Sequence, residues 1–153
     1  LMQDSFGYGS AITGAFGILG IVGALGATFV GKISSNNSNH SIILVGTLLL
    51  ILSWAILLFS GNSLIGLMFG VLLVDLGLQS LHITNQKIIF SKNPEARNRV
   101  NTIYMVGFFI GGAFGTVAGA MAWGHYKWIG VSTLGIILSV LILISHLAFR
   151  KEE

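Results

Sequence analysis

Two long stretches without an acidic, basic or histidine side chain constrain the fold of this chain more than any other feature. They cover residues 8–30 and residues 41–74. A helix that crosses the hydrocarbon core of a membrane needs about 20 mostly apolar residues, because each residue rises 1.5 Å. Both stretches are long enough, and the second has room for two helices with a turn between them. The chain is therefore predicted to cross a membrane several times.

The composition indicates that lipid, and not water, surrounds most of the chain. Of its 153 residues, 54% are hydrophobic and only 8% are charged, and the mean hydropathy is +0.86. A soluble domain carries about a quarter charged residues, because its surface faces water. A large soluble core is the alternative, and this composition disfavours it.

Composition and motifs also exclude several classes of function. The chain has no cysteine, so it forms neither disulfides nor thiolate metal sites. Its formal charge of +3 is small and spread along the chain, so nucleic acid is not an expected partner. The motifs His-Glu-x-x-His and Gly-x-Ser-x-Gly and a phosphate-binding loop are absent. We therefore expect no enzymatic activity, no metal and no cofactor.

Apolar runs separated by short polar or charged segments predict the number and position of the spans. The fold class that follows is all-α: a polytopic membrane protein of about five transmembrane helices, without a separate soluble domain. The predicted spans are residues 8–30, 41–60, 63–86, 100–123 and 128–149.

The basic residues predict the orientation of these spans. With five spans, every Lys and Arg except Lys127 falls on the same side of the membrane. Short cytoplasmic loops are enriched in Lys and Arg, so this side is predicted to be cytoplasmic. The N-terminal end is then outside, and the C-terminus is cytoplasmic. Arg97 and Arg99 are the basic pair of the predicted loop before the fourth span.

A glycine repeat marks one face of the fourth predicted span. Gly107, Gly111, Gly115 and Gly119 recur every fourth residue, which aligns them along one side of a helix. Small residues let helices approach closely in lipid, where the hydrophobic drive between helices is missing. The repeat predicts a helix-packing face. Two interpretations stay open: static packing, and a smooth face along which helices rock during transport.

The third predicted span carries a polar face. Asp75, Gln79, His82 and Gln86 follow i, i+4, i+7, i+11 spacing and share one side of a helix, with Asn85 beside them. Asp75 is the only acid inside a predicted span and lies near its middle. A carboxylate at mid-bilayer costs at least ~2.5–3.5 kcal/mol, so it is expected to face the protein interior or a wet cavity. These residues are the candidates for proton coupling or for lining a cavity.

The alternative is that these side chains only bond neighbouring helices. Interhelical hydrogen bonds contribute about 0.6 kcal/mol on average, which hardly offsets the cost of an acid in lipid. This comparison favours a functional role for Asp75. His82 is the other side chain of the face that changes charge near neutral pH. Gln79 and Asn85 could bind a substrate or only another helix.

Residues 71–105 closely resemble the tenth helix, the following loop and the start of the eleventh helix of major facilitator superfamily transporters. The likeness is to the drug- and sugar-efflux branch of bacterial permeases. Its elements read Asp-x-Gly-x-Gln, Asn-Gln, Ile-Phe, Pro-x-Ala-Arg-x-Arg and Asn-Thr-x-Tyr-Met. Here they fall on Asp75, Gly77, Gln79, Asn85, Gln86, Ile89, Phe90, Pro94, Ala96, Arg97, Arg99, Asn101, Thr102, Tyr104 and Met105.

The resemblance implies helices eight to twelve of a twelve-helix transporter in the bacterial inner membrane. The expected missing parts are the N-terminal half and helix seven, since such transporters bind a small molecule between two halves near the midplane. The hypothesis that follows is proton-coupled efflux of a small molecule by alternating access. A membrane module that does not transport, but assembles with partner helices, is the alternative function.

Overall fold

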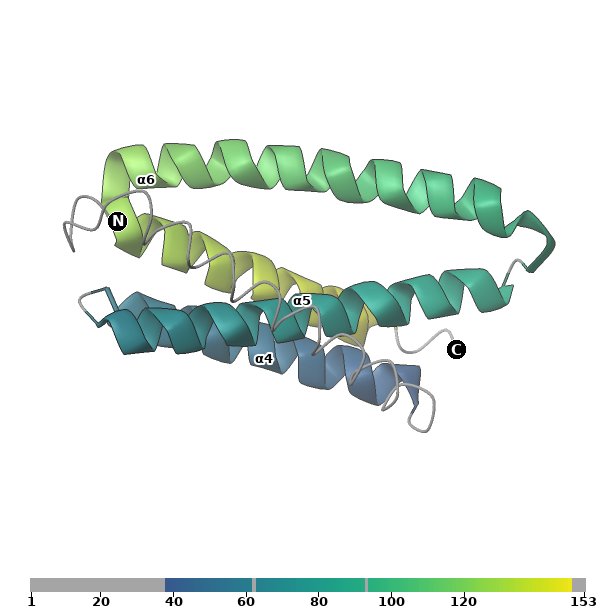
Figure 1. Cartoon of the computed structure of the whole chain (residues 1–153), viewed down its shortest axis with the longest axis horizontal. Coiled ribbons are helices and arrows are strands. Elements are labelled where there is room, and N and C mark those ends of the chain that lie inside the picture. The colour runs from purple at the N-terminus through teal and green to yellow at the C-terminus, as the bar shows by residue number, and fades with distance from the viewer. Residues whose placement is uncertain (1–37, 62, 93, 150–153) are drawn as a thin grey trace.

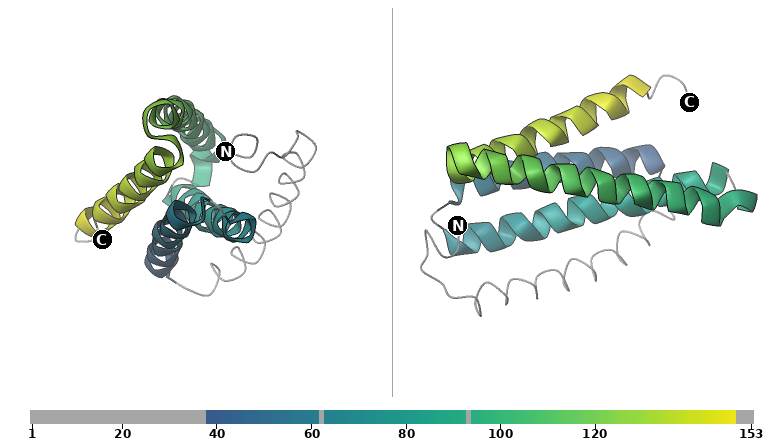
Figure 2. Two further views of the ribbon diagram at one scale, coloured as in Figure 1. Left: turned by 90° about the vertical axis from the view of Figure 1, so that its left-hand side faces the viewer. Right: turned by 90° about the horizontal axis from the view of Figure 1, so that it is seen from above.

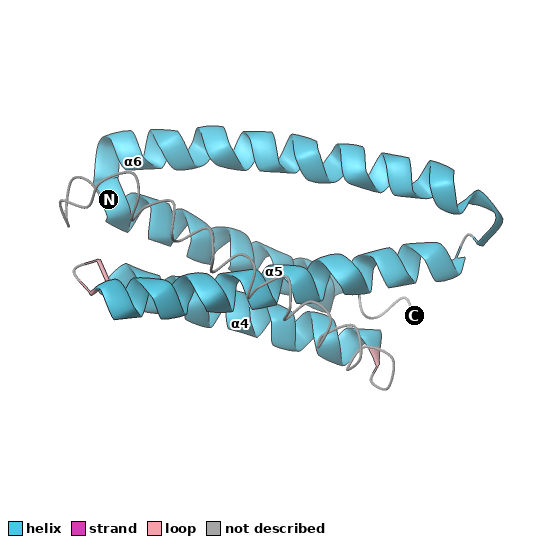
Figure 3. Ribbon diagram, in the orientation of Figure 1, coloured by secondary structure: helices cyan, strands magenta, loops and turns pink. Residues whose placement is uncertain are grey.

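The computed structural model describes residues 38–61, 63–92 and 94–149, and these residues are almost entirely helical (Figures 1 and 3). Helix α4 spans Asn39–Phe59 and helix α5 spans Leu64–Lys92. A short 3₁₀ helix, η1, covers Pro94–Ala96, and helix α6 spans Arg97–Phe149. The predicted span 8–30 lies outside the described residues, so the total of five spans stays a prediction.

Helix α6 consists of two arms joined at Lys127. A straight helix of 53 residues would be about 80 Å long, far more than a membrane requires. Lys127 interrupts it with φ 52° and ψ −138°. Figure 1 shows the chain turning back at this point, so the arms 97–126 and 128–149 run in opposite directions. Their limits lie close to those of the predicted spans 100–123 and 128–149.

Three of the described helical segments are long and apolar enough to cross a membrane: Asn39–Phe59, Leu64–Lys92 and Pro94–Ala148. Large apolar side chains cover much of their outer surface, including Phe59, Ile65 and Phe114, which are 88%, 81% and 74% exposed. Water would penalise such a surface, whereas lipid does not. The chain is an integral membrane protein.

Helices α4 and α5 pack closely through glycine. They lie side by side in Figures 1 and 2, and the carbonyl oxygen of Gly46 would be 3.0 Å from a Cβ atom at Gly77. A Cβ at Gly77 would also lie 2.8 Å from Leu50, and one at Gly70 would lie 2.6 Å from Leu57. These glycines therefore let leucines of α4 sit directly against the backbone of α5.

The second arm of α6 packs on α4 through two tryptophans. The indole N–H of Trp128 donates a hydrogen bond to the carbonyl oxygen of Leu57, at 2.6 Å. In the last turn of α4 this carbonyl oxygen also accepts a hydrogen bond from the Ser60 N–H, at 3.2 Å. Farther along, the ring of Trp54 occupies the space where a side chain at Gly135 would be. Trp128 therefore connects the turn at Lys127 to the C-terminal end of α4, and Trp54 packs the arm 128–149 against the middle of α4.

The ends of these elements differ in several places from the predicted boundaries. The first arm of α6 begins at Arg97, so Arg97 and Arg99, predicted to lie in a loop, are helical. Two further differences concern α5 and α4. Helix α5 continues to Lys92, whereas the span was predicted to end at residue 86, so Lys87 is helical. His40, which precedes the predicted span 41–60, belongs to the first turn of α4, where the Ser38 side chain caps the helix by accepting a hydrogen bond from the Ser41 N–H. The sequence rule missed both because a polar residue can extend a helix beyond its apolar run.

Candidate functional site

The polar face of α5 points away from α4. Residues that α5 buries include Gly70, Gly77 and Thr84. At 3.6 residues per turn, Asp75, Gln79, His82 and Gln86 lie roughly half a turn from that buried stripe. All four are half-buried. The packing of α4 on α5 therefore leaves the polar face free to meet other elements.

The first arm of α6 meets this face at His82. The Tyr104 hydroxyl and the Nδ1 atom of His82 form a hydrogen bond of 3.0 Å. The rings of Tyr104 and Phe108 lie 5.4 Å and 4.9 Å from the imidazole, between centroids. Asn85 also forms a side-chain hydrogen bond with Tyr104. The structure thus brings together two predicted site residues, His82 and Asn85, with one that was not predicted.

Tyr104 is not among the site residues predicted from the sequence; it belongs only to the Asn-Thr-x-Tyr-Met element of the resemblance. Its level along the helix, compared with the level of His82 on α5, could have identified it. His82 lies 22 residues before Tyr104, and the intervening chain turns back at Pro94–Ala96. Positions about equally far from such a turn reach the same level of two antiparallel helices. Pairing His82 with residues on the following helix would have selected Tyr104.

Asp75, Gln79 and Gln86 have no hydrogen bond or ion pair with other side chains of residues 38–61, 63–92 and 94–149. Asp75 lies about 10 Å from His82 along the helix axis, toward the middle of the span. A carboxyl group there can take up and release a proton, or bind a polar group of a substrate. The contacts of the described residues do not test which of these roles it has.

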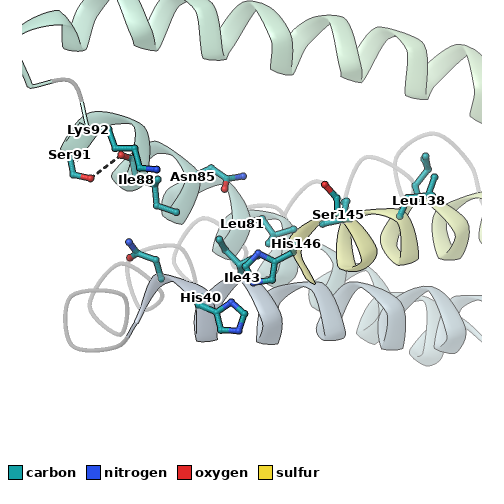
Figure 4. Close-up of a pocket in the computed structure, with 13 residues that line it drawn as sticks. His40, Ile43, Leu81, Asn85, Ile88, Ser91, Lys92, Leu138, Ser145 and His146 are labelled. Carbon is teal, nitrogen blue, oxygen red and sulfur yellow. Dashed lines mark hydrogen bonds between the residues drawn. The ribbon is translucent and has the colours of Figure 1, made fainter. Parts of the chain in front are cut away.

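A pocket of about 1270 Å³ lies elsewhere, at one end of the bundle. The start of α4, the end of α5 and the end of α6 line it (Figure 4). Asn85 is the only predicted site residue among its lining residues, and Asp75, Gln79 and His82 are not part of it. Across it, the imidazole rings of His40 and His146 stack with centroids 4.5 Å apart.

The described basic residues gather at that same end. Lys92 lines the pocket, and Arg97 and Arg99 follow after η1, both exposed. The guanidinium group of Arg97 lies over the Phe90 ring, 5.2 Å from its centroid. Lys127 lies at the opposite end, at the turn between the arms of α6. This distribution is the one that the charge pattern of the sequence predicts.

The glycine repeat of the first arm is open in this structure. A Cβ atom built at Gly107, Gly111, Gly115 or Gly119 would meet no atom within 4 Å. The predicted packing face therefore has no partner among the described helices, and its role stays a prediction. The glycines that do bring described helices together are Gly46, Gly70, Gly77 and Gly135, and all of them lie outside that repeat.

The chain is similar to bacterial proteins named as transporters. It is 39% identical to the uncharacterized transporter YgaY of Escherichia coli O157:H7, over 80% of the chain. It is 28% identical to the probable transporter SCO4007 of Streptomyces coelicolor over 86% of the chain. An uncharacterized transporter of Buchnera aphidicola is 22% identical over 99% of the chain.

These relatives are considerably longer than the present chain. It spans 32%, 31% and 36% of their respective lengths. No protein-family model matches the chain, and no solved structure matches it. The relatives are named as transporters, not enzymes, so the comparisons support a role in membrane transport in general terms.

Proposed function

We propose that this chain forms part of the C-terminal half of a major facilitator superfamily transporter, which exports a small molecule by proton-coupled alternating access. The polar face of α5 is the observation that carries the proposal. It places Asp75, Gln79 and His82 on the side of α5 that does not pack on α4, in a bundle whose outer surface is largely apolar. The likeness to proteins named as transporters supports it.

The proposed mechanism assigns a different task to each part of the bundle. Asp75 takes up and releases the proton, and Gln79 lines the cavity through which the substrate passes. His82, oriented by the Tyr104 hydroxyl, connects α5 to the first arm of α6. Helix α4 and the arm 128–149 form a packed support. The arm 97–126, with its open glycine face, is the element that rocks against the other half of the transporter.

The test measures proton exchange in everted membrane vesicles that contain the gene product as its host encodes it. Respiration acidifies the vesicle lumen, and a pH-sensitive dye reports the release of protons when a transported compound is added. A panel of cationic drugs, neutral drugs and sugars supplies the compounds. We expect at least one of them to release protons, and we expect Asp75→Asn to abolish that release while membrane insertion stays normal.

Glu95→Gln is the matched control, because Glu95 is an exposed acid of the η1 turn outside the polar face. It should leave proton release unchanged. Proton release by Asp75→Asn with the wild-type pH dependence would contradict the assigned role of Asp75. Absence of any response to the whole panel would contradict proton-coupled transport of these compounds.

A second candidate function rests on the open glycine face of the arm 97–126. A membrane module that assembles with partner helices would use Gly107, Gly111, Gly115 and Gly119 as its contact surface. This function predicts a stable oligomer in mild detergent that Gly111→Leu dissociates, together with no response in the vesicle assay. A monomer that transports would exclude it.

A further inference from the structure

The pocket at the end of the bundle has the same order of side chains on each of the three helices that line it. Polar residues lie at the helix ends, and apolar residues lie deeper. The polar residues are Asn39 and His40 on α4, Ser91 and Lys92 on α5, and Ser145 and His146 on α6. The deeper apolar residues are Ile43 on α4, Ile88 and Leu81 on α5, and Ile142, Leu141 and Leu138 on α6.

Among the described lining residues, Asn85 is the one polar side chain in the deeper region. Figure 4 shows the order along the pocket, with Ser91 and Lys92 near one end and Leu138 toward the other. A ligand that fits this arrangement has a polar group at one end and a long apolar part.

The length of the pocket fits one leaflet of a membrane. From Lys92 to Leu81 the α5 axis advances about 16 Å, at 1.5 Å per residue. Half of the hydrocarbon core of a bilayer is about 15 Å thick. A lipid tail that starts beside Lys92 would therefore reach the middle of the membrane at about the level of Leu81.

The charge of the pocket fits an anion. Lys92, His40 and His146 line it, and none of the described lining residues is Asp or Glu. The nearest acid along the described chain, Glu95, is an exposed residue of η1. A phosphate group between the Lys92 ammonium and the stacked imidazoles of His40 and His146 would lie among basic side chains and would meet no carboxylate among the described lining residues. Basic pockets between membrane helices suit anionic lipid headgroups.

The apolar part of the pocket is also accessible from the lipid side. Leu141, Leu138 and Ile142 are 54%, 45% and 39% exposed. A lipid can therefore enter sideways from the bilayer. Free phosphate would leave this apolar surface uncovered, so the arrangement favours an amphiphile over a small anion.

We propose that this pocket binds one anionic phospholipid, with its phosphate beside Lys92, His40 and His146 and one acyl chain along Leu81, Leu141 and Leu138. The lipid would bridge α4, α5 and the second arm of α6 at the end where the basic residues gather. The inference is independent of the transported compound and of proton coupling.

The test compares two lipids with identical oleoyl chains, dioleoyl phosphatidylglycerol and dioleoyl phosphatidylcholine. Each is titrated into the delipidated, detergent-solubilised gene product, and native mass spectrometry measures the bound lipid. We expect one phosphatidylglycerol to bind more tightly than phosphatidylcholine. Lys92→Gln should weaken its binding about fivefold, because one basic side chain near an anionic headgroup contributes about that factor. Lys127→Gln, at the opposite end of the bundle, should leave it unchanged.

A second pair of variants tests the acyl chain site. Leu141→Trp fills the apolar part of the pocket, and we expect it to reduce phosphatidylglycerol binding at least tenfold. Ile137→Trp is the matched control, because Ile137 lies on the same arm and is 51% exposed, yet does not line the pocket. It should bind lipid as the wild type does.

Three results would overturn the proposal. The first is equal binding of the two lipids. The second is lipid binding that neither Lys92→Gln nor Leu141→Trp reduces. The third is competition by glycerol 3-phosphate as strong as by the intact lipid, which would identify a site for the free anion. All three are independent of the vesicle assay, so this inference and the proposed function can fail separately.

Discussion

At the scale of single residues, the contact between α5 and the first arm of α6 centres on one polar pair. The Tyr104 hydroxyl and the His82 Nδ1 atom lie 3.0 Å apart, and Phe108 covers the imidazole. In lipid, an interhelical hydrogen bond contributes only about 0.6 kcal/mol to stability on average, because the polar groups of separated helices also form hydrogen bonds. The pair is therefore better suited to orienting His82 than to holding the bundle together.

Tyr104→Phe tests this view of the pair. We expect the free energy of unfolding in detergent to fall by about 1.2 kcal/mol, because two interhelical bonds of the hydroxyl, to His82 and to Asn85, are lost at about 0.6 kcal/mol each while the ring contacts remain. Tyr126→Phe is the control, since Tyr126 is 71% exposed and lies next to the turn. A loss above about 2 kcal/mol would show that Tyr104 supports the fold itself.

Lys127 is the described non-glycine residue with a positive φ angle. Side chains with a Cβ atom adopt this conformation at a cost of order 1–3 kcal/mol, whereas glycine adopts it freely. Lys127→Gly should therefore raise the free energy of unfolding by about 1 kcal/mol, even though it removes the ammonium group over Trp123, 5.8 Å from the ring centroid. Chemical denaturation in detergent measures the change.

Lys127→Ala is the control for this prediction. It removes the same charge but keeps a Cβ atom, so it should not stabilise the protein. Equal effects of Gly and Ala would mean that the backbone conformation at this turn carries no strain.

At the scale of helices, the contact between α4 and α5 depends on backbone proximity. Gly77→Ala places a methyl group 2.8 Å from Leu50 and 3.0 Å from the Gly46 carbonyl oxygen, and the latter cannot move without shifting α4. Overpacking of this kind costs typically 1–3 kcal/mol. We expect Gly77→Ala to lower the unfolding temperature in detergent.

Gly124→Ala is the matched control for the helix contact. Gly124 is also helical, and a Cβ atom there meets no atom within 4 Å. Alanine forms helices better than glycine, so this substitution should be neutral or slightly stabilising. Similar losses from both substitutions would contradict the close approach of α4 and α5.

The helices were largely predictable from sequence, but their contacts were not. Uninterrupted apolar runs locate α4, most of α5 and both arms of α6, because a membrane requires that length of apolar chain. The contacts between helices could not be predicted, because small residues, which mediate packing in lipid, occur throughout these helices. Gly77 and Gly111 look alike in sequence, yet only Gly77 touches another described helix. Which face is covered depends on neighbours that no local pattern reveals.

At the scale of the whole molecule, the two ends of the bundle differ in charge and in cavities. Lys92, Arg97 and Arg99 lie at the end that holds the pocket, and Lys127 lies at the other. The charge asymmetry could be counted from the sequence, because it needs only the order of spans. The pocket could not be predicted, because its residues come from three separate helices and share no motif.

The candidate site, too, was only partly predictable from the sequence. Periodicity placed Asp75, Gln79, His82 and Gln86 on one face, and α4 does not cover that face in the structure. The partner of His82 required knowledge of the turn at Pro94–Ala96 and of how far each helix continues. Helix α5 runs to Lys92, beyond its apolar part, and that extension sets Tyr104 at the level of His82.

In the proposed transport mechanism, the polar face of α5 lines a water-filled path that opens to each side of the membrane in turn. The sequence has no cysteine, so Gln79→Cys and Leu78→Cys each introduce a unique thiol into these 153 residues. A membrane-impermeant maleimide, added to right-side-out or everted vesicles, measures access to each thiol. We predict that Cys at position 79 is labelled from both sides, at rates that an imposed pH gradient shifts in opposite directions, while Cys at 78 stays unlabelled. Equal, slow labelling of both positions, unaffected by the gradient, would contradict the claim.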